Sequence, residues 1–119
     1  MRVLVADDSR VMRRIVARTL RQAGYDWEVL EAEDGLEARD LILREKPDLV
    51  LSDWNMPNLN GLDLLRQLRQ MGSLVPVALV TSEGSAQMRE LAEQAGALFL
   101  IAKPFTAEQF RTEIERVLA

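Results

Sequence analysis

The stretch DLVLSDWNMPNLNG, residues 48–61, contains an apolar run that ends abruptly on a carboxylate. Residues 49–51 (LVL) have the continuous apolar character of a strand that is covered on both faces of a sheet. Asp53 follows almost at once, and residues 60–61 (NG) have the composition of a turn before a helix. A buried strand that delivers a carboxylate to its carboxyl end predicts a parallel sheet with a polar site at that edge.

Similar short apolar runs recur along the chain, and amphipathic segments separate them. The runs occupy residues 3–5, 29–30, 49–51, 77–80 and 98–101. Four of the five are nearly continuous, whereas the run at 29–30 lies in the alternating, charged WEVLEAE and predicts an edge strand.

The amphipathic segments carry apolar residues at helical spacing. These stripes are Met12, Ile15, Val16, Leu20 and Ala23; Leu36, Ala38, Leu41 and Ile42; Leu62, Leu64, Leu65 and Leu68; Met88, Leu91, Ala92 and Ala95; and Phe110, Ile114, Val117 and Leu118. Thr106 and Gln109 have the spacing of a capping box, and Phe105 and Phe110 that of a hydrophobic staple. Five strands alternating with five helices predict an α/β fold, a doubly wound parallel sheet with helices on both faces.

The composition bounds the class of protein. A chain of 119 residues with 48% hydrophobic residues suits one folded domain, here 1–119. The absence of cysteine excludes disulfide and thiolate metal sites and fits a reducing compartment, and the absence of histidine excludes histidine-based catalysis. The net charge of -4 disfavours direct nucleic-acid binding, and no apolar run reaches the ~20 residues of a membrane span. We expect an acidic cytoplasmic domain without a nucleic-acid or membrane partner.

Polar residues follow four of the predicted strands. They are Asp7 and Asp8, Asp53, Thr81, and Lys103 with Pro104. Each alone has an ordinary interpretation as a turn, cap or strand residue. Together, the carboxyl ends of parallel strands would bring three carboxylates, a hydroxyl and an ammonium to one rim.

Three neighbouring carboxylates need compensation. Two unit charges about 4–5 Å apart at an effective dielectric near 20 repel by about 3–4 kcal/mol. Such a site therefore retains a proton with a raised pKa or binds a cation. Oxygen ligands without histidine or cysteine favour a hard ion, Mg²⁺ or alternatively Mn²⁺.

A hard cation beside a lysine and a hydroxyl is typical of phosphate chemistry. A carboxylate can attack phosphorus when the developing charge is neutralised. Asp53 is the best candidate nucleophile because its strand should be central. Lys103 would pair with one phosphoryl oxygen, and Thr81 would donate a hydrogen bond to another.

This arrangement resembles the receiver domains of bacterial response regulators, and the resemblance extends over essentially the whole chain. The runs that carry it are DDSRVMRRIV, EAEDG, SDWNMPN, VTSEG, QAG and KPF. Several of them are closest to the single-domain chemotaxis response regulators. The resemblance implies a (βα)5 flavodoxin-like fold with strand order 2-1-3-4-5.

The resemblance also implies roles for individual residues. Asp53 would accept a phosphoryl group from the phosphohistidine of a histidine kinase or from a small donor such as acetyl phosphate. Asp8 and Asp53 would bind Mg²⁺ through their carboxylates and Asn55 through its main-chain carbonyl, while Asp7 would act mostly through water.

Further implied roles concern the switch. Lys103 would contact the phosphoryl group, with a cis bond to Pro104, and Thr81 would move toward the phosphoryl group. The side chains of Asn55 and Glu83 would influence the phosphoryl lifetime, although Glu83 has an equal claim to be a solvated loop residue. A surface near the fourth helix, last strand and last helix would then bind an output protein, a flagellar motor component if the system is chemotactic.

Three features depart from the family or lack a role in it. Leu100 occupies the position where the family usually has tyrosine or phenylalanine, and Phe99 is offset by one residue, which directs it to the opposite face and into the core. Asn60 stands where the family often has aspartate. The first helix carries five arginines, which form a solvated face or a partner surface: Arg10, Arg13, Arg14, Arg18 and Arg21.

Four other interpretations compete with this one. A phosphohydrolase with an aspartyl-phosphate intermediate usually needs an Asp-x-Asp motif and a substrate-covering cap, and VADDSR has no such motif. A flavodoxin-like cofactor protein would need a Ser/Thr/Gly-rich phosphate loop after the first strand. A nonphosphorylated receiver would not need the complete set of residues found here. The chain could also be the receiver of a longer regulator with a DNA-binding or enzymatic output.

Overall fold

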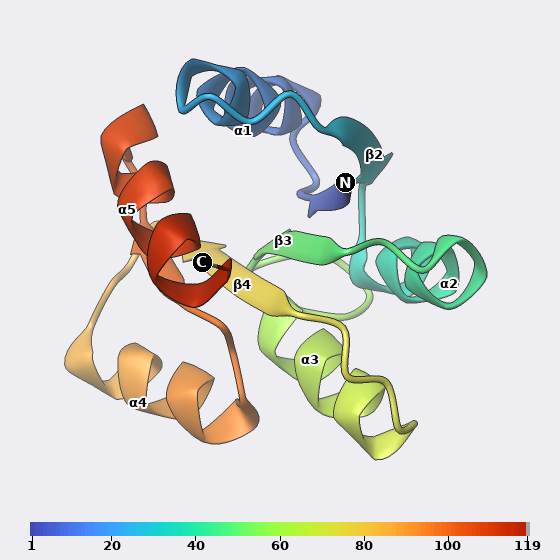
Figure 1. Cartoon of the computed structure of the whole chain (residues 1–119). Helices are drawn as coiled ribbons and strands as arrows, with labels where there is room; N and C mark the ends of the chain where they lie inside the picture. The colour runs from blue at the N-terminus through green and yellow to red at the C-terminus, as the bar shows by residue number, and fades with distance from the viewer. Residues whose placement is uncertain (119) are drawn as a thin grey trace.

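Five strands form one parallel sheet in the order β2-β1-β3-β4-β5 (Figure 1). The computed structural model describes residues 1–118. The elements are β1 (Arg2–Ala6), α1 (Arg10–Gln22), β2 (Glu28–Ala32), α2 (Gly35–Glu45), β3 (Leu49–Asp53), α3 (Gly61–Gln70), β4 (Val77–Thr81), α4 (Ala86–Ala95), β5 (Leu100–Ala102) and α5 (Ala107–Leu118). This (βα)5 flavodoxin-like fold, its strand order and the edge position of β2 are confirmed predictions.

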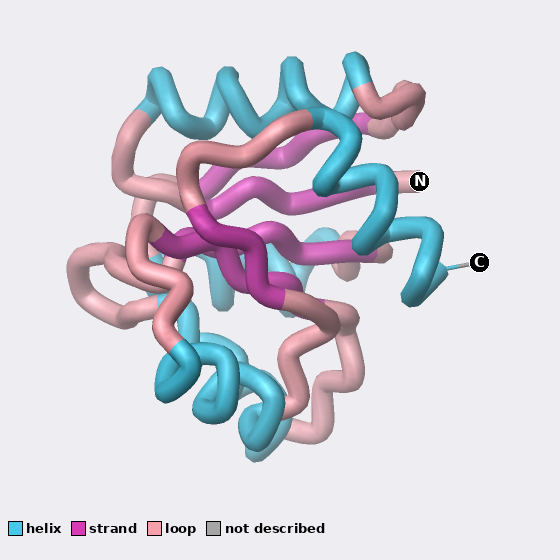
Figure 2. Tube along the Cα trace, turned by 90° about the vertical axis from the view of Figure 1, so that its left-hand side faces the viewer, coloured by secondary structure: helices cyan, strands magenta, loops and turns pink. Residues whose placement is uncertain are grey.

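Helices cover both faces of the sheet, so the molecule has three layers (Figures 1 and 2). Helices α1 and α5 pack on one face, where Val3 and Val5 of β1 meet Phe110. Helices α2, α3 and α4 cover the other face, where Leu4 points. Alternate residues of one strand therefore belong to opposite halves of the core, which explains why the central strands are apolar throughout.

Polar side chains cap the helices at their N-termini. The caps Ser9, Asp34, Asn60 and Ser85 each accept a hydrogen bond from the main-chain N–H three residues further on. Thr106 and Gln109 exchange the two bonds of a capping box, 2.8 Å and 3.1 Å long. The rings of Phe105 and Phe110 meet edge to face, 4.8 Å apart, so the predicted staple is also confirmed.

The last strand begins later than predicted. β5 starts at Leu100 rather than at residue 98, although the main chain already bonds to β4 before it. The N–H of Leu98 donates to Val77, and the carbonyl of Phe99 accepts from Leu79. The strand is short because β5 lies at the sheet edge and pairs only with β4. Phe99 is buried beside Phe110, as its one-residue offset predicts.

None of the helices in residues 1–118 combines the length and the apolar character that a membrane span requires.

Candidate functional site

The carboxyl ends of β1, β3, β4 and β5 lie side by side, and each delivers a polar side chain to the same rim. Sheet hydrogen bonds continue into the loops and fix these positions. The N–H of Asp7 donates to Ala32 (3.0 Å), and the N–H of Lys103 donates to Thr81 (2.7 Å). The predicted site residues on these four strands therefore converge, although they are separated by dozens of residues in the chain.

Asp7, Asp8 and Asp53 form the acidic centre of the site. One carboxylate oxygen from each lies within 4.8 Å of the others. Asp7 and Asp53 are buried, with 4% and 8% of their surfaces exposed, whereas Asp8 is exposed at the mouth. Carboxylates at this spacing, without nitrogen or sulfur ligands, fit a hard divalent cation that keeps part of its water shell.

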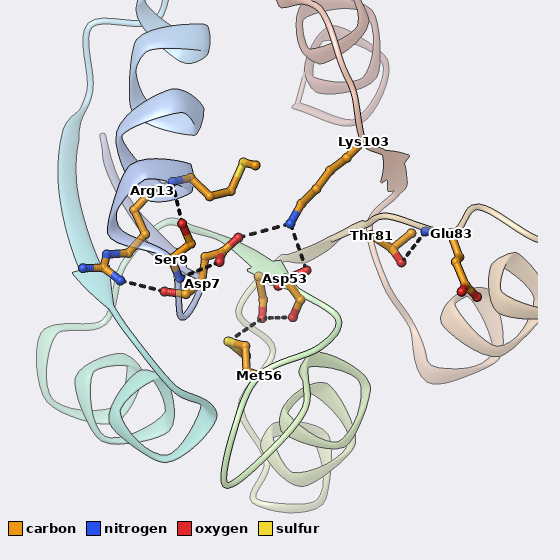
Figure 3. A network of polar contacts seen from close by, with 10 residues as sticks. Asp7, Ser9, Arg13, Asp53, Met56, Thr81, Glu83 and Lys103 are labelled. Atoms are coloured by element: carbon orange, nitrogen blue, oxygen red, sulfur yellow. Dashed lines mark hydrogen bonds and ion pairs between the residues drawn. The ribbon is translucent and has the colours of Figure 1, made fainter.

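Lys103 bridges the two buried carboxylates (Figure 3). Its Nζ lies 3.3 Å from Oδ2 of Asp7 and 3.3 Å from Oδ1 of Asp53. The side chain of Lys103 is 18% exposed, so these ion pairs are only partly screened by water. The Lys103–Pro104 peptide bond is cis, as the resemblance implies. One ammonium shared between two of three carboxylates leaves negative charge in excess.

The pKa of Asp53 reflects this excess. Burial raises the pKa above its ordinary value, and the neighbouring Asp7 carboxylate raises it further. Lys103 opposes the shift by its charge and its hydrogen bond, and a main-chain hydrogen bond from Asn55 opposes it as well. The net direction is upward, so the site favours anything that neutralises Asp53: a proton, a cation or a covalent modification.

Thr81 lies at the end of β4 with its side chain completely buried. Its Oγ1 accepts a hydrogen bond from the N–H of Glu83 (3.1 Å), which leaves the Thr81 hydroxyl hydrogen for another acceptor. The Glu83 side chain is exposed and lies beyond Thr81 when viewed from Asp53 (Figure 3). Asn55 is exposed too. The roles predicted for Glu83 and for the Asn55 side chain stay predictions.

The loop after Asp53 is packed tightly against the end of β3. The N–H of Gly61 donates to the carbonyl of Trp54 (2.9 Å), and a Cβ added at Gly61 would lie only 2.3 Å from the carbonyl oxygen of Asp53. Trp54 is buried in the core cluster that includes Met56 and Leu62. Its side chain therefore packs into the core under the loop and does not cover the rim of the site. The hydroxyl of Ser52 donates to the carbonyl of Asp53 (2.9 Å).

Sequence reasoning missed two supporting residues. The N–H of Ser9 donates to Oδ1 of Asp7 (2.9 Å), and the guanidinium of Arg13 donates to the carbonyl of Asp7 (2.7 Å). Arg13 is one of five arginines on α1, and nothing in the sequence distinguishes it from the four exposed ones. Arg13 contacts the Asp7 carbonyl because of its position on α1 relative to the loop after β1, which only the folded chain shows.

Leu100 lies at the sheet edge, where the family usually has an aromatic residue. It is half-buried, and its carbonyl accepts a long hydrogen bond (3.4 Å) from Arg89 of α4. Arg89 and Leu100 line a groove that continues over Pro104 to Gln109 of α5. The groove therefore lies directly beside the strand end that carries Lys103.

Fold and site together match a known family. Residues 3–115 match the response regulator receiver domain. A chemotaxis protein CheY homolog from Campylobacter jejuni is 42% identical, covering 99% of this chain and 92% of the relative. Chemotaxis protein CheY1 of Helicobacter pylori is 40% identical, with 99% and 97% covered. The structure of CheY4 from Vibrio cholerae superposes with a TM-score of 0.84 at 32% identity, covering 98% and 97%.

The chain belongs to the response regulator receiver domain family. Receiver domains are signal-transduction switches controlled by phosphorylation, and they interact with histidine kinases and output targets.

Proposed function

We propose that Asp53 is the phosphoryl acceptor of this receiver domain and that Mg²⁺ is required for the transfer. The observation that carries the proposal is the shared contact of Lys103 with Asp7 and Asp53 inside a cluster of three carboxylates. Lys103 places one positive charge beside Asp53, and a cation held by the three carboxylates would add a second, which together would neutralise a phosphoryl group on approach.

The residues fit a magnesium ion. Asp8 and Asp53 would bind it through their carboxylates and Asn55 through its main-chain carbonyl, and Asp7 would act through a water molecule; Mn²⁺ would suit the same oxygen ligands. When bound, the ion supplies positive charge to the carboxylates and to the phosphoryl oxygens. Bond formation to phosphorus and the contacts to the phosphoryl oxygens would be made by the side chains of Asp53, Lys103 and Thr81.

In the proposed reaction, an oxygen of Asp53 forms a bond to phosphorus as the bond from phosphorus to the donor breaks. The donor is the phosphohistidine of a histidine kinase or a small acyl phosphate, and its nitrogen or oxygen leaves with the electron pair. The Asp53 carboxylate loses its own charge on phosphorylation, so Lys103 exchanges its 3.3 Å contact with Oδ1 for a phosphoryl oxygen. Thr81, whose hydroxyl hydrogen is available, moves to donate to another phosphoryl oxygen.

The proposed switch acts on one domain, residues 1–119, and catalyses only its own phosphorylation and dephosphorylation. Asn55 and Glu83 would influence the lifetime of the phosphoryl group. The groove from Arg89 over Leu100 and Pro104 adjoins Lys103, so movement of Thr81 and Lys103 would change the surface that an output protein binds.

The biological setting is proposed from the relatives. The Campylobacter and Helicobacter proteins are named for chemotaxis, so a chemotaxis kinase and a flagellar motor component are the partners we favour. The absence of cysteine fits a cytoplasmic setting for such a system.

Incubation with acetyl phosphate tests the proposal. The intact protein should gain the mass of one phosphoryl group when Mg²⁺ is present and none when it is chelated. Asp53→Asn should abolish the gain, whereas Asp26→Asn, which changes an exposed aspartate of the α1–β2 loop, should not. Labelling that survives in Asp53→Asn would exclude Asp53 as the acceptor. Continuous release of phosphate from a monoester substrate would instead indicate a phosphohydrolase.

A further inference from the structure

Arg13, the fourth residue of α1, reaches to the main chain of Asp7 at the end of β1 (Figure 3). Its Nη1 donates a 2.7 Å hydrogen bond to the main-chain carbonyl of Asp7, and its Nε donates a 2.8 Å bond to Glu31 on edge strand β2. We propose that Arg13 is the positioning residue of the acidic site, which orients Asp7 and Asp8 for Mg²⁺. The inference rests on the magnesium site proposed above.

The burial of Arg13 sets it apart from its neighbours. Its side chain is 12% exposed. The other arginines of α1 are all exposed: Arg10, Arg14, Arg18 and Arg21. A guanidinium that gives up most of its hydration must recover it in hydrogen bonds, and both bonds of Arg13 are short.

The contact controls Asp8 through the backbone. The carbonyl of Asp7 lies in the same rigid peptide plane as the N–H of Asp8, so a bond that fixes the first also fixes the second. Among residues 1–118, no side chain or main-chain group holds the Asp8 carboxylate by a hydrogen bond or an ion pair. The direction in which Asp8 points into the site therefore depends on the Asp7–Asp8 peptide, and hence on Arg13.

Asp7 itself is held on every polar group. Its N–H donates to Ala32 (3.0 Å), and its carboxylate accepts from the N–H of Ser9 (2.9 Å) and from Lys103 (3.3 Å). Arg13 supplies the partner of the remaining group, the carbonyl. Without Arg13 the Asp7 carbonyl would turn toward water while Ser9 and Lys103 still hold the Asp7 carboxylate. Rotation of this peptide would therefore mainly change the direction of the Asp8 carboxylate.

Only an arginine side chain can bond Glu31 and the Asp7 carbonyl at the same time. The planar guanidinium holds the N–H groups of Nε and Nη1 in fixed and different directions, so Nε bonds Glu31 while Nη1 bonds the Asp7 carbonyl. A lysine ammonium is a single point charge on a flexible stem and cannot span the two acceptors in this way. Glu31 is half exposed, so its ion pair adds little stability and serves mainly to orient the Arg13 guanidinium.

Magnesium titration tests the inference. The chain has two tryptophans, so a Trp27→Phe background leaves Trp54, beside Asp53, as the reporter. Arg13→Gln should raise the Kd for Mg²⁺ about tenfold, the lower end of the effect that supporting residues have on metal sites. Glu31→Gln should raise it about threefold, since it weakens only the bond to Nε of Arg13. Arg14→Gln, the exposed neighbour, should leave the Kd unchanged.

A kinetic readout separates positioning from a general loss of structure. The rate of labelling by acetyl phosphate in Arg13→Gln should fall at low Mg²⁺ and return close to the unmodified rate at saturating Mg²⁺, because Asp53 and Lys103 are intact. A lowered maximal rate would indicate a structural role instead and would overturn the inference.

The remaining outcomes are equally decisive. An unchanged Kd in a folded Arg13→Gln variant overturns the inference and leaves the proposed function standing. No Mg²⁺ binding by the unmodified chain overturns both. If Arg13→Gln does not fold, Glu31→Gln and Arg13→Lys take its place in the same titration, and an unchanged Kd in both overturns the inference.

Discussion

Nζ of Lys103 lies 3.3 Å from Oδ2 of Asp7, a residue 96 positions earlier in the chain, and 3.3 Å from Asp53 as well. One ammonium thus serves two buried carboxylates, while the third carboxylate, Asp8, faces solvent. The site is electrostatically incomplete, because the negative charge exceeds the positive charge that the protein supplies. This imbalance favours the uptake of positive charge, as a proton or a cation.

Removal of the shared cation should destabilise the fold. Lys103→Gln leaves Asp7 and Asp53 buried without a cation partner, and we expect the free energy of unfolding at neutral pH to fall by about 2 kcal/mol. That is less than the 3–5 kcal/mol seen for fully buried pairs, since Lys103 is 18% exposed. Urea unfolding in a chelating buffer measures the change.

The other lysine provides the control for this variant. Lys46 caps α2 at the surface, and Lys46→Gln should change stability by no more than about 0.5 kcal/mol. Equal stability losses in the two variants would contradict the role of Lys103 as the structural partner of the carboxylates.

Neutralisation of Asp53 should stabilise the fold in the absence of metal. Burial and the Asp7 carboxylate raise the pKa of Asp53 above its ordinary 3.8, so the folded state holds this proton more tightly than the unfolded state. The resulting stability is fully present below pH 3.8 and is lost as the pH rises through the folded-state pKa. Asp53→Asn avoids the loss and should gain about 1 kcal/mol at neutral pH.

The pH dependence makes this prediction specific. Urea unfolding of Asp53→Asn and the unmodified chain should show a difference at neutral pH that shrinks as the pH falls toward 3.8. Asp26→Asn, an exposed substitution, should show no comparable gain. A destabilised Asp53→Asn at neutral pH would mean that Lys103 outweighs burial and Asp7 in setting the pKa of Asp53.

Loss of the exposed carboxylate should separate metal binding from stability. Asp8→Asn removes a proposed Mg²⁺ ligand whose side chain is exposed, so the metal-free protein should keep its stability within about 0.5 kcal/mol. Mg²⁺ at ten times its Kd should stabilise the unmodified chain by about 1.4 kcal/mol and the variant by much less. Thermal unfolding with Mg²⁺ and with a chelator measures both quantities, and equal stabilisation of the two proteins would exclude Asp8 as a ligand.

Gly61 lies against the main chain of Asp53, and we expect that it cannot be replaced by alanine without a large loss of stability. In Gly61→Ala the new Cβ would lie 2.3 Å from the carbonyl oxygen of Asp53, and the backbone must move to relieve the clash. We expect a loss of about 3 kcal/mol, the upper range for overpacking, together with weaker Mg²⁺ binding.

Gly24→Ala gives the contrast, because nothing lies within 4 Å of its added Cβ. Its positive φ of 99° alone should cost about 1 kcal/mol, without an effect on Mg²⁺ binding. Chemical denaturation and the Trp54 titration distinguish the two. A tolerated Gly61→Ala with normal Mg²⁺ affinity would show that the loop after Asp53 adapts more readily than its packing suggests.

Local patterns in the sequence predict most of the fold because they act over short distances. The apolar run at residues 49–51 becomes the central strand β3, and Thr106 with Gln109 caps α5, since both depend on neighbours within a few positions. The start of β5 was predicted two residues too early, because apolar character continues through Leu98 and Phe99 while regular pairing does not. Pairing depends on β4, which is distant in the chain.

The amino-acid pattern alone identifies the polar residues that follow the strands, and parallel strand order makes Asp7, Asp53, Thr81 and Lys103 neighbours. How charge is divided among them depends on the folded molecule, which buries Asp7 and Asp53 and lets both share Lys103. It alone selected Arg13 from five arginines to hold the Asp7 carbonyl. Burial and hydrogen-bond geometry depend on distances between segments, and the order of residues in the chain leaves these distances open.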